Sequence, residues 1–143
     1  MTASSAGSAP RANVLLYSNR PEVRARVRTA VGRRPAPDAP RIDWVECGKH
    51  AEVVEQADLG EIDLMILDGE AQPTGGMGLA RQFKYEITDC PPVIVLLARK
   101  EDGWLASWSL ADALISQPFD PVTASATVAD QLRRRLAGIP VVR

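Results

Sequence analysis

The residue with the clearest chemical potential is Asp68, which ends a run of large apolar residues, Ile62-Asp63-Leu64-Met65-Ile66-Leu67. A run with so little polar alternation is typical of a strand that is covered on both faces of a parallel sheet. Ligands of such sheets bind where the strands end, so Asp68 is placed where a carboxylate can bind a metal or act as a nucleophile. Which of these it does depends on the side chains around it.

Two features close to Asp68 in the chain are weaker candidates. Glu70 is a second carboxylate, but we expect its side chain to point away from a site at Asp68. The segment from Gln72 to Gly78 is rich in glycine and precedes a helix, as phosphate-binding loops do. It has neither a Walker lysine nor the G-x-G-x-x-G spacing, which favours a simple turn.

Strand and helix patterns alternate along the chain. Buried-strand patterns occur at 13–17, 42–46, 62–68, 93–97 and 113–115. Apolar residues recur at helical spacing in 21–31, 50–57, 79–87 and 122–136, and briefly in 104–108. Pro21 is typical of the first turn of a helix, and Gly32 is typical of the residue that ends one. This order predicts a doubly wound α/β fold with a parallel five-stranded sheet. We expect one domain at 13–137, an N-terminal tail at 1–12 that is disordered or bound to a partner, and a C-terminal tail at 138–143.

Composition narrows the class of protein. Cys47 and Cys90 are far apart and match no metal or disulfide motif, which favours reduced thiols in the cytoplasm. No stretch approaches the ~20 apolar residues of a membrane span, so we expect no direct membrane insertion. The net charge is −1, yet six arginines fall between Arg20 and Arg34, and nine acidic residues between Asp43 and Glu70. Such charge runs can steer a protein partner toward the surface, or they can simply be solvated faces. We expect no nucleic acid as a partner.

Three stretches together resemble a response-regulator receiver domain over residues 13–137. They are Asp63-Leu64-Met65-Ile66-Leu67-Asp68 with the later Gly76-Met77-Gly78-Leu79, then Pro91-Pro92-Val93-Ile94-Val95-Leu96, and Ala111-Asp112-Ala113-Leu114-Ile115-Ser116-Gln117-Pro118-Phe119. The resemblance implies a CheY-like, flavodoxin-like (βα)5 fold with strand order 2-1-3-4-5. It also implies a site at the carboxyl ends of the strands, with Asp68 at the phosphoacceptor position.

The other site positions of the family carry different residues in this chain. Its metal-binding acidic pair maps to Ser18 and Asn19, its Thr or Ser to Leu97, and its Lys to Gln117. This degenerate acidic pocket lacks the carboxylates that Mg²⁺ prefers and the cation that stabilises a transferred phosphoryl group. We therefore predict a vestigial phosphoacceptor at Asp68, paired with Arg20. We predict no catalytic residue, metal or cofactor, and no enzyme activity.

Partner-binding candidates lie on the predicted helices. Trp104 and Trp108 either pack as a core stripe or include an exposed anchor, since Trp is enriched at binding hot spots. The arginines of the first and last helices are expected to form one positive surface; they are Arg24, Arg28, Arg133, Arg134 and Arg135.

The resemblance to stand-alone, actinobacterial receiver-like proteins implies a non-enzymatic interaction module that works without phosphorylation. Such a pseudo-receiver would be a regulatory or accessory subunit of a larger assembly, for which the respiratory NADH dehydrogenase is a candidate. It would be cytoplasmic, or peripheral to a membrane complex. Two alternatives stay open: a two-component response regulator phosphorylated on Asp68 by an unusual mechanism, and a small-ligand sensor.

Overall fold

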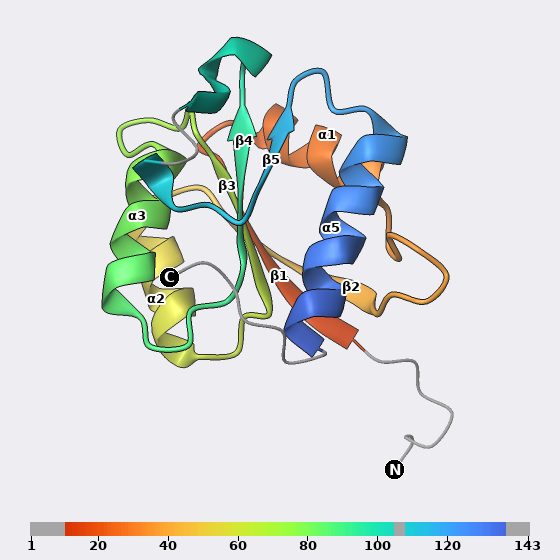
Figure 1. Cartoon of the computed structure of the whole chain (residues 1–143). Helices are drawn as coiled ribbons and strands as arrows, with labels where there is room; N and C mark the ends of the chain where they lie inside the picture. The colour runs from red at the N-terminus through yellow and green to blue at the C-terminus, as the bar shows by residue number, and fades with distance from the viewer. Residues whose placement is uncertain (1–10, 105–107, 137–143) are drawn as a thin grey trace.

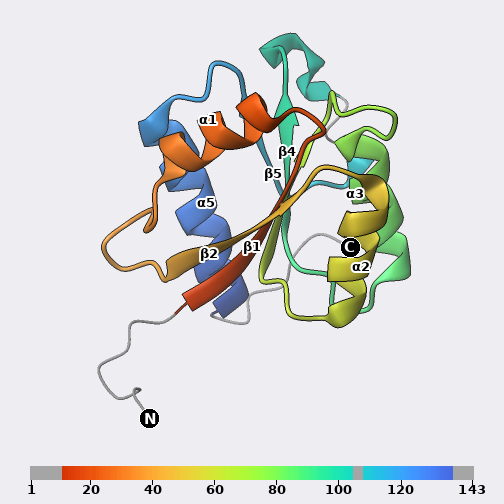
Figure 2. The same cartoon turned by 180° about the vertical axis from the view of Figure 1, so that it is seen from behind.

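Five parallel strands form a single sheet at the centre of the protein (Figures 1 and 2). A computed structural model describes residues 11–104 and 108–136 of the chain. The strand order is β2-β1-β3-β4-β5, which confirms the predicted fold. The strands are β1 (Arg11–Tyr17), β2 (Arg41–Cys47), β3 (Leu64–Asp68), β4 (Val93–Leu97) and β5 (Ala113–Ser116).

Helices cover both faces of this sheet. On one face lie α1 (Pro21–Val31) and α5 (Pro121–Leu136), and on the other α2 (His50–Leu59) and α3 (Gly76–Glu86) (Figure 1). A short 3-10 helix, η1 (Lys100–Trp104), follows β4. Within residues 11–104 and 108–136, no helix combines the length and apolar character that a bilayer crossing requires.

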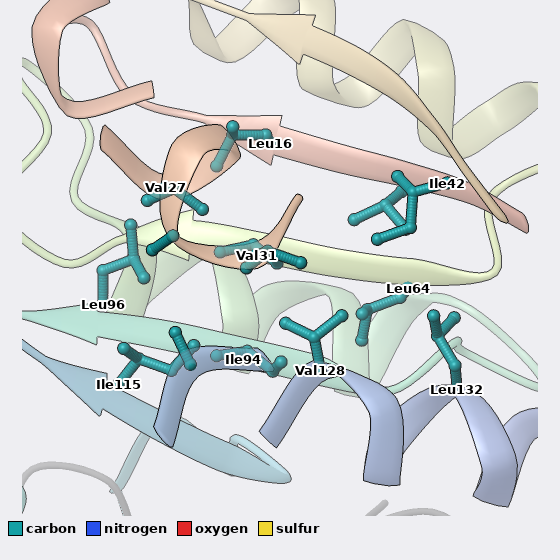
Figure 3. Close-up of a cluster of buried hydrophobic side chains, with 14 of the residues drawn as sticks. Leu16, Val27, Val31, Ile42, Leu64, Ile94, Leu96, Ile115, Val128 and Leu132 are labelled. Atoms are coloured by element: carbon teal, nitrogen blue, oxygen red, sulfur yellow. The ribbon is translucent and has the colours of Figure 1, made fainter. Parts of the chain in front are cut away.

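The core consists of two apolar layers, one on each face of the sheet. Successive side chains of a strand point to opposite faces, so Leu64 (Figure 3) and Ile66 pack toward α1 and α5, while Met65 and Leu67 pack toward α2 and α3. All five residues of β3 are buried, as are all five of β4. This double coverage explains why their sequences show no polar alternation.

Several element boundaries differ from the predicted ones. The second strand is as long as the first, because β2 pairs with β1 in register from Arg41 opposite Arg11 to Cys47 opposite Tyr17. Both strands extend beyond their predicted ranges of 13–17 and 42–46. The third strand begins at Leu64 rather than at residue 62. The predicted tails at 1–12 and 138–143 lie outside the described residues, except that Arg11 and Ala12 belong to β1.

The start of α3 lies against the backbone at the end of β3. A Cβ atom built on Gly76 would lie 2.7 Å from the carbonyl oxygen of Asp68, and one on Gly69 would lie 2.8 Å from that of Leu96. Neither contact can be relieved by moving a flexible side chain. Glycine at position 76 lets α3 begin directly beside the site at Asp68, and glycine at position 69 lets the loop after β3 lie against the end of β4.

We expect Gly76→Ala to lower the free energy of unfolding by about 2 kcal/mol, since overpacking against backbone forces the helix to shift. Gly78 is the matched control on the same helix, because a Cβ there meets nothing within 4 Å. Gly78→Ala should raise stability by about 0.5–1 kcal/mol through helix propensity. Urea unfolding of both variants measures the difference, and equal stabilities would contradict the close approach.

Candidate functional site

Asp68 lies at the carboxyl edge of the sheet, between the ends of two neighbouring strands. Its own strand, β3, pairs with β1 on one side and β4 on the other. This places Ser18, which follows β1, and Leu97, which ends β4, at the same edge. The Asp68 side chain is 1% exposed, so the groups that contact it decide its chemistry.

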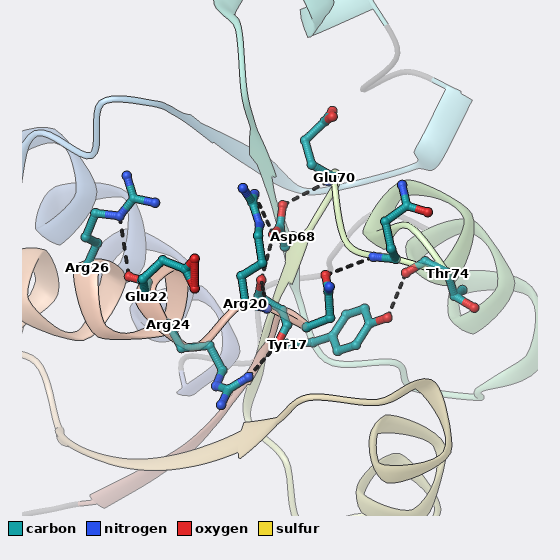
Figure 4. A network of polar contacts seen from close by, with 11 residues as sticks. Tyr17, Arg20, Glu22, Arg24, Arg26, Asp68, Glu70 and Thr74 are labelled. Atoms are coloured by element: carbon teal, nitrogen blue, oxygen red, sulfur yellow. Dashed lines mark hydrogen bonds and ion pairs between the residues drawn. The ribbon is translucent and has the colours of Figure 1, made fainter.

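Both carboxylate oxygens of Asp68 accept hydrogen bonds from the chain itself (Figure 4). Oδ2 accepts from the Ser18 hydroxyl at 2.7 Å, and the Arg20 guanidinium lies 3.5 Å from the same oxygen as an ion pair. Oδ1 accepts from the backbone N–H of Glu70 at 2.9 Å. The predicted pairing of Arg20 with Asp68 is thus present. The Glu70 side chain extends away from Asp68, as expected.

Further hydrogen bonds fix the turn between β1 and α1. The Ser18 hydroxyl oxygen accepts the backbone N–H of Arg20 at 3.1 Å, while the Ser18 carbonyl accepts from the Arg24 guanidinium. Ser18 is fully buried, so its hydroxyl contacts the Asp68 carboxylate without competition from solvent. The turn therefore presents a hydroxyl and a guanidinium, both hydrogen-bond donors, to Asp68.

Asn19 and Tyr17 bind the loop that follows β3. Asn19 Oδ1 accepts the backbone N–H of Gln72 at 2.9 Å, and the Tyr17 hydroxyl donates to the carbonyl of Thr74 at 2.7 Å. Burial, and to a lesser degree the charge of Asp68, raises the pKa of Tyr17, so the hydroxyl keeps its proton at neutral pH. The loop after β3 is thereby tied to the end of β1.

The remaining edge of the site is apolar or neutral. Leu97 is 3% exposed, and the backbone N–H of Gln117 donates to its carbonyl at 2.9 Å. Among residues 11–104 and 108–136, no group of three or more His, Cys, Asp or Glu side chains is arranged to hold a metal ion.

Burial raises the pKa of the Cys47 thiol to about 11, so Cys47 is not a nucleophile at neutral pH.

The arginines proposed for a positive surface lie on α1 and α5, two helices that pack against each other, and each has an acidic neighbour. Arg24 and Arg28 both pair with Glu46 on β2. On α5, each of three consecutive arginines pairs with a different carboxylate. These pairs are Arg133 with Asp38, Arg134 with Asp130 and Arg135 with Asp89. Arg133 holds the pKa of the Asp38 carboxyl below its ordinary value through the hydrogen bonds between them. Because Arg24 and Arg28 share the single carboxylate of Glu46, these pairs do not cancel every charge, and the positive surface stays a prediction.

The two tryptophans do not form a core stripe. The side chain of Trp104 is 73% exposed and that of Trp108 is 50% exposed, while Leu105 lies outside the described residues. Trp108 contacts α3, where the Arg81 guanidinium lies 5.1 Å from its ring and 5.3 Å from the ring of Tyr85. The sequence reasoning missed Arg81 and Tyr85. Their spacing of four residues outside the apolar stripe of α3 was the available signal.

Comparison with known proteins identifies the family. No protein-family model matches the chain. An uncharacterized response regulatory protein of Mycobacterium tuberculosis is 49% identical over 120 residues, which cover 84% of this chain and 90% of the relative; matching proteins are recorded for two strains. The chain belongs to the response-regulator receiver family.

Solved receiver domains share the fold at much lower sequence identity. The receiver domain of the Francisella response regulator 1452 is 18% identical, with a TM-score of 0.71 over 86% of this chain and 98% of that domain. The response regulator TrrA of Thermotoga maritima, solved in complex with Mg²⁺ and BeF, is 20% identical, with a TM-score of 0.68 over 84% of this receiver and 98% of that chain. Receivers are in general signalling modules without catalytic activity of their own. Their partners are signalling proteins.

Proposed function

We propose that this receiver is a phosphorylation-independent interaction module, a pseudo-receiver that serves as a regulatory or accessory subunit of a larger protein assembly. The contacts of Asp68 carry this proposal. The Ser18 hydroxyl donates a hydrogen bond to one oxygen of the carboxylate, the Arg20 guanidinium forms an ion pair with the same oxygen, and the Glu70 N–H binds the other. A carboxylate held in this way is a structural residue at the end of a buried strand.

The absence of the family's acidic pair supports the proposal, because it indicates weak Mg²⁺ binding. Ser18 and Asn19 stand where the family places its acidic pair, and the Asn19 side-chain oxygen is already bound to Gln72 N–H. Each unit charge about 4 Å from the ion contributes on the order of 4 kcal/mol per ionic charge at an effective dielectric near 20, before desolvation. The loss of two such charges weakens Mg²⁺ binding by several kcal/mol, even after the cost of desolvating the charged groups is subtracted.

The site also lacks the groups that stabilise phosphoryl transfer in the family. Catalysis of this reaction rests on positioning and on neutralising the charge of the transferred oxygens. Leu97 and Gln117 occupy the positions that supply a hydroxyl and a cation in the family, and neither side chain carries a positive charge. Arg20, the cation beside Asp68, is already paired with the carboxylate that would have to attack.

We expect the native partner complex to form equally well with wild-type protein and with the nearly isosteric variant Asp68→Asn. Tagged forms of both, purified from the native host, should retain the same subunits in the same ratios. A phosphorylation switch predicts instead that Asp68→Asn loses or permanently gains a partner. Loss of subunits from a variant that still unfolds cooperatively would therefore overturn the proposal.

We further propose the respiratory NADH dehydrogenase as the assembly to test first, with the receiver on its cytoplasmic side at the membrane surface. The support is the resemblance to actinobacterial receiver-like proteins, together with the mycobacterial relative. In the same purification, subunits of that enzyme should accompany the tagged receiver. A reproducible, stoichiometric set of other subunits would overturn the choice of assembly and leave the interaction module intact.

A further inference from the structure

One exposed cluster on the receiver has the composition of a binding hot spot. Arg81 and Tyr85 lie one turn apart on α3, and Trp108 lies beside them on the short helical segment that precedes β5 (cyan in Figure 1). The side chain of Tyr85 is 71% exposed and that of Trp108 is 50% exposed. Tyr, Trp and Arg are the residues most enriched at hot spots of protein interfaces. We call these three residues the arginine–aromatic patch.

The contacts within the patch hold Arg81 in place. Its guanidinium lies 5.3 Å from the Tyr85 ring centroid and 5.1 Å from that of Trp108, both within the range of cation–π attraction. Its Nη1 donates to the carbonyl of Trp108 at 2.6 Å, and its Nη2 lies 3.4 Å from the Tyr85 hydroxyl. A guanidinium fixed in this way loses little further side-chain entropy when a partner binds.

The charge of Arg81 is not offset within the described part of the chain. Arg133, Arg134 and Arg135 each pair with a carboxylate, whereas the contacts of Arg81 are aromatic rings, a carbonyl and a hydroxyl. The preferred ligand of a preorganised guanidinium is a carboxylate, which can accept two parallel N–H groups. The adjacent exposed rings are suited to an apolar side chain next to that carboxylate.

We infer that the arginine–aromatic patch is the docking surface for a partner protein segment that presents an Asp or Glu beside an apolar side chain. This inference rests on the proposed interaction module and specifies its surface. A phosphorylated segment or an anionic membrane would favour several basic residues, whereas the patch has one cation and Glu86 follows it on the same helix. The charge of a single carboxylate matches this surface.

Photo-cross-linking in the native host tests the inference on the intact complex. Glu86 is exposed on α3 and directly follows Tyr85 in the chain, and Val122 is 80% exposed on α5, on the other face of the sheet. We expect p-benzoylphenylalanine in place of Glu86 to cross-link a partner peptide that contains an Asp or Glu. The same group in place of Val122 should yield no adduct.

Charge reversal supplies the matched comparison. Arg81→Glu should lower the adduct yield about tenfold or more, because it sets like charges opposite each other. Arg134→Glu, a control on α5, should leave the yield unchanged. Changing the cross-linked partner carboxylate to lysine should restore the adduct with Arg81→Glu, an effect that loss of folding cannot produce.

The other outcomes separate the surface from the function. Adducts from position 122 but not from 86 would overturn the patch while the interaction module stands. An adduct between two copies of the receiver, or with lipid, would overturn the stated partner chemistry. If neither position cross-links and the native protein runs as a single chain, both the inference and the proposed function fail.

Discussion

Replacing Lys84 by methionine should lower the free energy of unfolding by about 3 kcal/mol or more, the largest loss that we expect from a single substitution. The Lys84 side chain on α3 is fully buried, and its Nζ lies 2.6 Å from Oδ2 of Asp112, which is 5% exposed. The same oxygen accepts the backbone N–H of Val93 at 2.7 Å. The pair thus joins α3 to the first residue of β4 and to the residue before β5.

The cost arises because Lys84→Met removes the ammonium group that lies against the buried carboxylate of Asp112. For a domain of this size we expect the melting temperature to fall by roughly 10 °C. The double variant Lys84→Met with Asp112→Asn removes both charges, while the amide oxygen still accepts the Val93 N–H. It should return to within about 1 kcal/mol of the wild type. A single variant as stable as the wild type would show that the buried pair contributes little.

Restoring the family's site residues should convert the receiver into a phosphoacceptor. The variant replaces Arg20 with alanine to free the carboxylate, and it returns two acids, a hydroxyl and a cation to the site. Its changes are Ser18→Asp, Asn19→Asp, Arg20→Ala, Leu97→Thr and Gln117→Lys. Because each missing donor or cation costs about 100-fold or more in such reactions, we expect phosphorylation by acetyl phosphate to accelerate by at least that factor.

Two controls keep this result specific to Asp68. The restored variant carrying Asp68→Ala should gain no phosphoryl group, and neither should the restored variant when Mg²⁺ is chelated. If the restored variant folds with wild-type cooperativity and still takes up no phosphate, the side-chain substitutions do not explain the inactivity that we propose for the site. In that case the geometry of the loop after β3, tied by Asn19 and Tyr17 in the wild type, becomes the explanation.

Much of the fold follows from local patterns in the sequence. Pro21 and Gly32 mark the beginning and end of α1, and the apolar runs of β3 and β4 mark strands covered on both faces. The ends of β2 were missed because only Ile42 and Cys47 of this strand are buried, so its sequence shows no continuous apolar run. Its ends are set by pairing with β1, a contact between segments thirty residues apart.

The site was predictable where topology alone decides which residues meet. Asp68 ends β3 and Arg20 follows the neighbouring β1, so their proximity follows from the strand order that the resemblance implied. The pairings of Arg133 and its two neighbours were not predictable, because consecutive helical residues point about 100° apart and each reaches a different surface. The stacking of Arg81 on Trp108 depends on how α3 packs against a segment 27 residues away, which no local pattern encodes.

The most direct test is the intact mass of the wild-type receiver after incubation with acetyl phosphate and Mg²⁺, measured beside Asp68→Ala. Both proteins should keep their unmodified masses, since the Asp68 carboxylate is held by Ser18, Arg20 and the Glu70 N–H. A stoichiometric wild-type species heavier by about 80 Da, the mass of one phosphoryl group, and absent from Asp68→Ala, would contradict the phosphorylation-independent module.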